Sequence, residues 1–379
     1  MENKRYGREK SLALIKELCL AFGPTGCEEP VAELIEKKLE ALHVPFMRDR
    51  MGNVIARLRF GKADGGAESL ERQRIMVSAH MDEVGFMITE VDGDGDLRID
   101  TVGGIDGSVM AGRRVLVGDG KRHMSGLIAS TAIHHKKKDE RSKAEKLEKL
   151  YIDIGATDRE EASGYAGVGS FATFDSEFYT FGKGDSFIKS KALDDRMGCA
   201  AMLEVIESLA GEELYVDADV YFCFTVREEI GLSGALCAAN LIRPHLAIVL
   251  ETTAVGDIEG ASPEKRVAEL GEGVCVSLMD RSTIYGRAET DLALRVAKEE
   301  GIALQVKKYV SGGNDAGSIH KSGGGVRTVA LSVPTRYLHS PACVANIEDY
   351  MSQRDMVEAM IRRSGEYFSD RALTLSKGK

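Results

Sequence analysis

The chain has 379 residues, which is more than one ordinary hydrophobic core holds, so its length predicts two domains. Hydrophobic residues make up 43% and charged residues 29%, as in an ordinary globular protein. The net charge of −10 disfavours nucleic acids and acidic membrane surfaces as partners. It excludes little about a substrate, since the field inside a cleft need not follow the total charge.

The start of the chain and its cysteines bear on where the protein works. Residues 1–5 lead into an amphipathic helix without the apolar core of a signal peptide, and no apolar run is long enough to span a membrane. The seven cysteines are dispersed, and none belongs to a Cys-x-x-Cys pair. An odd, dispersed set is typical of a reducing compartment, so we expect a cytoplasmic protein.

Hydrophobic spacing predicts two helices and two strands near the start of the chain. The helices are expected over Leu12–Cys19, where Gly23-Pro24 ends the pattern, and over Glu28–Leu42. The strands are expected over Val54–Ala56 and Ile75–Ala79, and the second has the apolar run of a buried strand.

From Val84 to about Phe181 short strand-like runs alternate with turns, which predicts a small β-rich module. Thr157 and Glu160 fit a capping box, so one short helix is expected there. The lysine-rich stretch from His134 to Lys149 is most simply a solvated, mobile loop. Its two adjacent histidines are able to bind a metal ion, but no further ligand nearby completes a site.

After about Gly182 strands alternate with helices again. Val220–Val226 and Leu246–Leu250 are almost continuously apolar, as expected of strands with both sheet faces covered. The other expected elements are the helices Met197–Leu209, Thr290–Glu300 and Ile347–Phe368 and the strands Leu304–Tyr309 and Thr328–Val333. The whole pattern predicts an α/β domain, residues 1–83 and 182–379, interrupted by an inserted β-rich domain, residues 84–181.

Two of the expected turns carry residues that suit a metal ion. His80 directly follows the strand Ile75–Ala79, and Asp82 lies two positions further on, so it can accept the second ring N–H of His80. A His-x-Asp triplet by itself is more often structural than catalytic. Asp194 and Asp195 stand where a turn enters a helix, and either one alone is more often a cap. An aspartate at this junction is also able to bridge two cations.

The sharpest local signal is a run of apolar strand residues that ends in the adjacent carboxylates of Glu228 and Glu229, followed by Gly231. Successive strand residues point in opposite directions, so one glutamate can bind metal while the other faces a substrate. The alternative, a solvent-exposed strand end, fits poorly after five residues with the pattern of a buried strand.

Glu251 and His339 follow two further expected strands. One such residue alone is most often structural, but open α/β sheets place their sites at the carboxyl ends of strands. Four strand ends with ligand-type residues therefore predict a metal site. Two imidazoles and three carboxylates suit two zinc-like ions, with Glu228 as the base that handles protons.

Several short motifs also carry a family resemblance. They are Gly23–Gly26, Ser78–Gly85, Ala192–Arg196, Arg227–Gly231 and Gly312–Ala316. Together they resemble the tetrahedral and glutamyl aminopeptidases, family forty-two of the metallopeptidases, over nearly the whole chain. The chain departs from the family pattern at Asn314, where Thr is common, and at Glu251, where Asp is frequent. The extra methylene at Glu251 bears on metal preference or coordination mode.

The resemblance assigns a role to each candidate residue. It implies that His80 and Glu251 are terminal ligands of one metal ion, that Glu229 and His339 are those of the other, and that Asp194 bridges the two. Glu228 would be the general base, and Asp82 would orient His80. The implied cofactors are two divalent ions per subunit, zinc first, with cobalt or manganese as alternatives.

The resemblance also implies a fold and partners. The fold would be an α/β catalytic domain, like that of other dinuclear exopeptidases, with an inserted β-barrel-like dimerisation domain. The substrates would be short peptides that lose their N-terminal residue. The subunits would form a homo-oligomer, in many relatives a hollow tetrahedral dodecamer built from dimers. The lysine-rich loop falls where the family has a mobile loop near a neighbouring subunit's active site.

Two other functions stay open at this point. Some similar proteins are labelled endoglucanases, but glycoside hydrolysis uses two carboxylates and no metal, which gives His80 and His339 no role. A non-catalytic scaffold or peptide-binding protein would need a degenerate site, whereas all five ligand candidates and the base are present. The side chain preferred at the peptide N-terminus and the physiological metal are not readable from the sequence.

Overall fold

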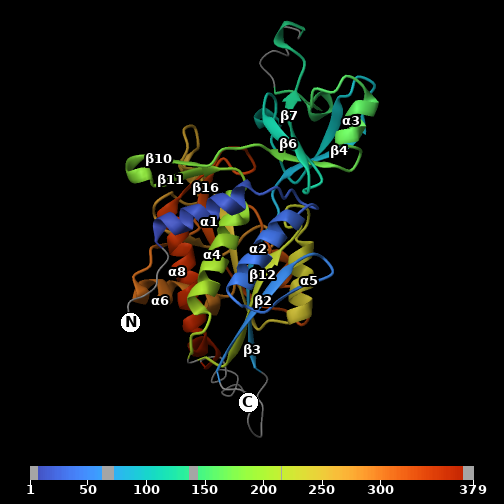
Figure 1. Ribbon diagram of the computed structural model, residues 1–379. Coiled ribbons are helices and arrows are strands. Elements are labelled where there is room, and N and C mark those ends of the chain that lie inside the picture. The colour runs from blue at the N-terminus through green and yellow to red at the C-terminus, as the bar shows by residue number, and fades with distance from the viewer. Residues whose placement is uncertain (1–6, 62–71, 136–143, 215, 370–379) are drawn as a thin grey trace.

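The computed structural model describes residues 7–61, 72–135, 144–214 and 216–369 (Figure 1). Residues 136–143 of the predicted lysine-rich loop therefore lie outside the described residues. Within the described part, two bodies are visible in Figure 1: a larger one of helices around a sheet, and a smaller β-rich one above it. Residues 1–83 and 182–379 and residues 84–181 remain the predicted domain limits.

The larger body contains a sheet of eleven described strands. In spatial order its main path is β1 (Phe46–Arg48), β2 (Val54–Phe60), β12 (Ala218–Thr225), β3 (Gln73–His80), β13 (Leu246–Ala254), β16 (Arg327–Arg336), β17 (Cys343–Asn346), β11 (Phe187–Ser190) and β10 (Tyr179–Phe181). Two short strands, β14 (Val274–Val276) and β15 (Leu304–Val306), attach to β16 through β14.

Four neighbouring strands of this sheet, β12, β3, β13 and β16, run parallel. Their carboxyl ends therefore meet at one edge, and Thr225 at the end of β12 lies opposite His80 at the end of β3. Parallel strands need helical crossovers that cover both faces, which explains why these segments are apolar without interruption. The four predicted ligand-bearing strand ends thus lie at the same edge of the sheet.

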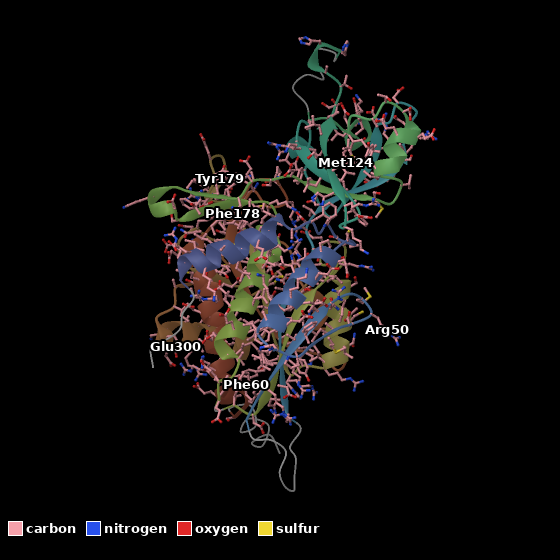
Figure 2. All side chains as sticks on the ribbon, in the orientation of Figure 1. Arg50, Phe60, Met124, Phe178, Tyr179 and Glu300 are labelled. Carbon is pink, nitrogen blue, oxygen red and sulfur yellow. The ribbon has the colours of Figure 1, made fainter. Side chains whose placement is uncertain are left out.

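Helices cover both faces of the sheet. One face packs against α1 (Arg8–Leu20), α2 (Glu29–Ala41), α4 (Leu193–Leu209), α6 (Arg287–Glu300) and α8 (Ile347–Arg362). The other packs against α5 (Ser233–Ile242) and α7 (Ala316–Ile319). Along β12, Phe222 and Phe224 enter the first core and Cys223 the second, as the alternation of strand side chains requires. Side chains fill the space between helices and sheet (Figure 2).

The inserted body is a closed six-stranded barrel in the order β4-β5-β8-β7-β6-β9. Its strands are β4 (Gly85–Val91), β5 (Leu97–Val102), β6 (Arg114–Gly118), β7 (His123–Ala129), β8 (Tyr151–Asp153) and β9 (Phe171–Phe174), with α3 (Arg159–Tyr165) beside them. The barrel has its own apolar core, in which the rings of Phe86 and Phe174 meet edge to face at 5.3 Å. Closure leaves no strand edge unpaired, which is one way to build a stable small β domain.

The remaining helical turns are short. They are η1 (Gly107–Val109), η2 (Ile133–His135), η3 (Leu147–Lys149), η4 (Lys183–Asp185) and η5 (Pro263–Lys265). None of the described helices combines the length and apolarity that crossing a bilayer requires. The seven cysteines are all among the described residues, and all are free thiols.

The fold class predicted from the sequence is confirmed, and local predictions need correction at α3, β15 and α8. The cap of α3 is Asp158, whose carboxylate accepts the N–H of Glu161, so the capping box predicted at Thr157 and Glu160 lies one residue too early. The Glu161 carboxylate reaches back to the N–H of Thr157. Strand β15 ends at Val306, three residues before the predicted end. Helix α8 ends at Arg362, and residues 364–369 form a further helical stretch after a turn.

Candidate metal centre

His80 is the last residue of β3 and is buried to 1% exposure. Its Nδ1 lies 3.0 Å from the backbone carbonyl of Asp82 and 3.5 Å from that residue's Oδ1. A carbonyl oxygen only accepts, so Nδ1 carries a proton, and Nε2 is the ring nitrogen that is left to bind a metal ion. Nε2 faces Asp194 Oδ1 at 3.3 Å and Glu251 Oε1 at 3.6 Å. The ring is therefore oriented as a metal ligand would be.

Asp194 lies between the two histidines. Helix α4 begins irregularly, since Ala192 has a φ of 52° and Asp194 itself is extended, with φ −82° and ψ 110°. This backbone turns the Asp194 carboxylate away from a capping position. Its Oδ1 lies 3.3 Å from His80 Nε2, and its Oδ2 lies 3.5 Å from His339 Nε2. One carboxylate thus presents an oxygen to each imidazole.

Glu228 and Glu229 follow β12 in a tight turn that begins at Arg227, whose φ is 58°. The turn is held by the Asp82 carboxylate, because Oδ1 accepts the N–H of Glu228 at 3.1 Å and Oδ2 accepts that of Glu229 at 3.2 Å. Thr25 donates its hydroxyl to the same Oδ2 at 2.8 Å. Asp82 therefore positions the two glutamates as well as neighbouring His80.

His339 and Glu251 complete the arrangement. His339 follows β16, and its Nε2 lies 3.3 Å from Glu229 Oε1, while its side chain remains 34% exposed, so the site opens to solvent on this side. Glu251 is inside β13, which continues to Ala254 instead of ending at Leu250 as predicted. Its Oε2 is buried and has no hydrogen-bond partner among the described residues. A buried, unpartnered carboxylate oxygen is costly unless a cation satisfies it.

The charges of these groups are strongly coupled. Burial disfavours the charged form of both imidazoles. The surrounding carboxylates nevertheless raise the pKa of His80 well above its ordinary value and that of His339 to about 9. Burial opposes ionisation of Asp194 as well, but His339 and His80 hold its pKa well below the usual range. The two protonated imidazoles thus supply the positive charge around this carboxylate.

The three glutamates are shifted in the opposite direction. Burial raises the pKa of Glu229 to about 7 and the pKa values of Glu228 and Glu251 well above their ordinary values. Ionising all of them in one buried cluster requires positive charge nearby. Divalent cations would supply it, since a bound ion is the largest local charge in such a site.

Three overlapping groups of the described residues are close enough to hold a metal ion. In each group the ligand atoms lie within 4.8 Å of one another. Two groups share Asp194: His80, Asp194 and Glu251, and Asp194, Glu229 and His339. The third contains His80, Glu228 and Glu229. Imidazole nitrogens with carboxylate oxygens form the donor set that zinc and similar divalent ions accept. The residues present therefore fit a pair of divalent ions that share Asp194.

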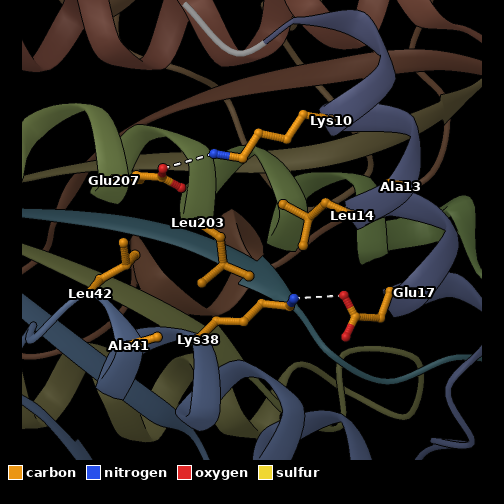
Figure 3. A pocket seen from close by; sticks show the side chains of 9 residues that line it. All are labelled: Lys10, Ala13, Leu14, Glu17, Lys38, Ala41, Leu42, Leu203 and Glu207. Atoms are coloured by element: carbon orange, nitrogen blue, oxygen red, sulfur yellow. Dashed lines mark hydrogen bonds and ion pairs between the residues drawn. The ribbon is translucent and has the colours of Figure 1, made fainter. Parts of the chain in front are cut away.

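The space beside the cluster is small. A hollow of 10 Å³, about the room that one water needs, is lined by residues that include Asp194, Glu229 and His339. A roomier hollow of 320 Å³ lies elsewhere, between α1, α2 and α4 (Figure 3). Its rim carries the ion pairs Lys10–Glu207 and Lys38–Glu17 over an apolar floor. No convergent ligand set lines that hollow, so the chemistry belongs to the histidine cluster.

Two residues that were not predicted from the sequence support the cluster. One contacts the strands that carry it, and the other belongs to the barrel. Asp315 Oδ2 accepts the hydroxyls of Thr225 at 2.7 Å and Ser78 at 3.3 Å. It thereby joins the Gly312–Ala316 motif to strands β12 and β3, and burial raises its pKa to about 6. Gly104 accepts from His339 Nδ1 at 2.6 Å. The motif around Asp315 was visible in the sequence, whereas nothing local marked Gly104.

Fold and cluster together define an α/β protein with an inserted barrel and a candidate metal centre, and comparison with known proteins gives the family. The family model described as M42 glutamyl aminopeptidase matches residues 59–356. The chain belongs to this family and is a peptide hydrolase. The sequence-based resemblance is thereby confirmed. A solved structure titled an endoglucanase from Thermotoga maritima is also similar, with 28% identity, a TM-score of 0.74 and coverage of 94% of this chain and 98% of that chain.

Similar proteins extend over almost the whole chain. A putative aminopeptidase of Acetivibrio thermocellus is 36% identical over 341 residues, which cover 90% of this chain and 95% of the relative. The crystal structure of a TET aminopeptidase from the archaeon Thaumarchaeota archaeon SCGC AB-539-E09 is 33% identical, with a TM-score of 0.86 and coverage of 94% and 96%. The TET1 peptidase of Pyrococcus horikoshii is 32% identical, with a TM-score of 0.81 and coverage of 92% and 98%. That peptidase can assemble into a tetrahedron or a large octahedral shell.

Proposed function

We propose that this chain is a dinuclear metal-dependent aminopeptidase that removes N-terminal residues from short peptides. The observation that carries the proposal is the Asp194 carboxylate, whose two oxygens face two different imidazoles. In the proposed site His80 and Glu251 would hold one divalent ion, Glu229 and His339 would hold the other, and both ions would share Asp194. Zinc is the expected ion, with cobalt or manganese as alternatives.

The bound ions would polarise the scissile carbonyl and lower the pKa of a water molecule. The chain's own residues handle the proton. Glu228 is the proposed general base, because burial raises the pKa of its carboxyl well above the ordinary value. A carboxylate with a raised pKa accepts a proton more readily at neutral pH and can return it to the leaving amine. Asp82 keeps Glu228 in place through its backbone N–H.

The base assignment is tested by Glu228→Gln, which keeps the shape of the side chain and removes its ability to take a proton. We expect turnover to fall by roughly 10²–10⁴-fold, the usual contribution of a general base, with metal content unchanged. Metal analysis and kinetics on aminoacyl-p-nitroanilides measure both quantities. Glu160→Gln on the exposed helix α3 is the matched control. Retained turnover in Glu228→Gln would rule out this base.

The proposal extends to the partners. Homo-oligomerisation is expected because a related peptidase is described as assembling into closed shells, and a tetrahedral dodecamer built from dimers is the proposed form. A substrate panel with acidic, neutral and basic N-terminal residues and different added metals would define specificity and metal preference together. Mass determination in solution tests the assembly.

A further inference from the structure

The two histidines of the centre are held by different parts of the molecule. His80 Nδ1 is held within its own segment, by the carbonyl of Asp82. His339 Nδ1 donates to the carbonyl of Gly104 at 2.6 Å, across 235 positions of sequence. Gly104 is the second residue after the end of barrel strand β5. The inserted barrel thus fixes which ring nitrogen of His339 faces Asp194 and Glu229.

The same barrel loop also touches Glu229. Gly103 has a φ of 82°, and a Cβ built on it would lie 2.7 Å from Val84 Cγ1 and 3.3 Å from Glu229 Cβ. Only glycine fits at this position without displacing its neighbours. A Cβ on Gly104, in contrast, would lie at an ordinary 3.7 Å from His339 Nδ1. The loop therefore packs closely against two residues that face one proposed ion, His339 and Glu229.

Contacts away from the ligands seat the barrel on the larger body. Lys191 binds Glu83 at 2.5 Å and reaches the hydroxyl of Thr173 on β9 at 3.3 Å, and all three side chains are buried. On the outside, the ring of His123 on β7 stacks on Phe22, with centroids 5.8 Å apart and planes within 3°. Together these contacts set where the Gly103-Gly104 loop lies.

We propose that the inserted barrel is part of the metal centre. Through Gly103 and the carbonyl of Gly104 it positions Glu229 and His339, so binding of the ion they share depends on how the barrel is seated. The ion held by His80 and Glu251 does not depend on it in this way, because no barrel residue contacts those side chains among the described interactions. The inference rests on the proposed function, which makes these four residues ligands.

The test is a stepwise titration of the metal-free full-length protein with zinc, followed by calorimetry. His339→Ala identifies which binding step belongs to the ion at His339. Gly103→Ala is expected to weaken that step by roughly 10–100-fold, the usual effect of disturbing a residue that orients a ligand, and to leave the other step within about threefold. Gly104→Ala, which keeps the carbonyl and has room for its Cβ, is the matched control and is expected to bind both ions normally.

A second variant covers the case in which Gly103→Ala does not fold. His123→Ala removes the stacking contact between the exposed ring of His123 and the buried ring of Phe22, and it is expected to weaken the same step selectively, by at least about threefold. A general loss of stability would affect both steps alike, so selectivity is the decisive readout. If the folded variants change the zinc affinity of both steps by the same factor, the inference is overturned, while the proposed function stays in place. If His339→Ala itself leaves both steps unchanged, the proposed function fails instead.

Discussion

The carboxylate of Asp82 accepts the backbone N–H of Glu228, with 3.1 Å between Oδ1 and the nitrogen, although 146 positions separate the two residues. Burial disfavours a charge here, but His80 and the amide donors lower the pKa of Asp82, so the residue is an anion at neutral pH. The short segment from His80 at the end of β3 to Asp82 therefore carries a proposed ligand and positions the proposed base. The Asp82 carboxylate thus joins the carboxyl end of β3 to the turn that follows β12.

Asp82→Asn should separate this positioning role from metal binding. The amide keeps one accepting oxygen but turns an NH₂ group toward the N–H of Glu228 or Glu229, so one hydrogen bond is lost. We expect turnover to fall by roughly 10–100-fold with a smaller change in KM, as measured by steady-state kinetics. Asp158→Asn, at the exposed cap of α3, should change neither value. Full turnover in Asp82→Asn would contradict the role of this carboxylate.

Chelation should lower the thermal stability of the protein. Buried glutamates and the unpartnered Glu251 Oε2 lose the cation that the proposed site provides for them. An ion present at 100 to 1,000 times its dissociation constant stabilises by about 2.7–4.1 kcal/mol, so for a chain of 379 residues the loss of each ion should lower the melting temperature by roughly 3–5 °C. Calorimetry with and without chelator measures the change. Equal melting temperatures would mean that the cluster does not hold metal in the native protein.

Zinc binding should release protons at neutral pH. The His339 pKa of about 9 means that the metal-free ring is protonated below that pH. A metal ion binds only the deprotonated ring nitrogen, so the proton must leave first. The contribution of His339 to the affinity should therefore rise by about tenfold per pH unit between pH 7 and 9, and level off above. Calorimetric titration in buffers of different ionisation enthalpy counts the protons. A result of zero protons at pH 7 would contradict the raised pKa.

Much of the centre was predictable because parallel strands converge at one edge. His80 ends β3, and Glu228 and Glu229 follow β12, so placing them on adjacent strand ends required only the apolar pattern and the rule for open sheets. Glu251 was harder to place, because the pairing of β13 with β16 extends the strand three residues beyond it. Local periodicity does not show where such pairing stops.

The supporting contacts were not predictable from local sequence. Gly104 lies in the barrel and meets His339 only after both domains have formed, and its interaction is made by a backbone carbonyl that any residue possesses. The capping error arose because Thr157 and Asp158 are both good caps, and one residue of offset decides which glutamate reaches back. Side-chain identity marks ligands, whereas the groups that orient them are mostly backbone.

The buried ion pair between Lys191 and Glu83, beside barrel strand β9, gives a last prediction. Lys191 and Glu83 are almost fully buried, and Arg196 lies 3.6 Å from the same carboxylate oxygen of Glu83. Removing one partner of a buried pair typically costs about 3–5 kcal/mol. Lys191→Met should cost less than Glu83→Gln, because Arg196 still neutralises Glu83 in the first variant, whereas two cations remain in the second. Urea denaturation at fixed metal concentration measures the free energies.

The double variant Lys191→Met with Glu83→Gln tests whether the two residues act together. We expect it to be less destabilised than the sum of the single variants, with a coupling of roughly 0.5–3 kcal/mol, because no charge of the pair is then left alone. Lys308→Met is the control, since Lys308 and Glu269 form an exposed pair at 3.3 Å and such pairs contribute about 1 kcal/mol or less. Additive losses would show that Lys191 and Glu83 do not act together, and a larger loss in Lys191→Met than in Glu83→Gln would show that Arg196 does not stabilise the Glu83 carboxylate.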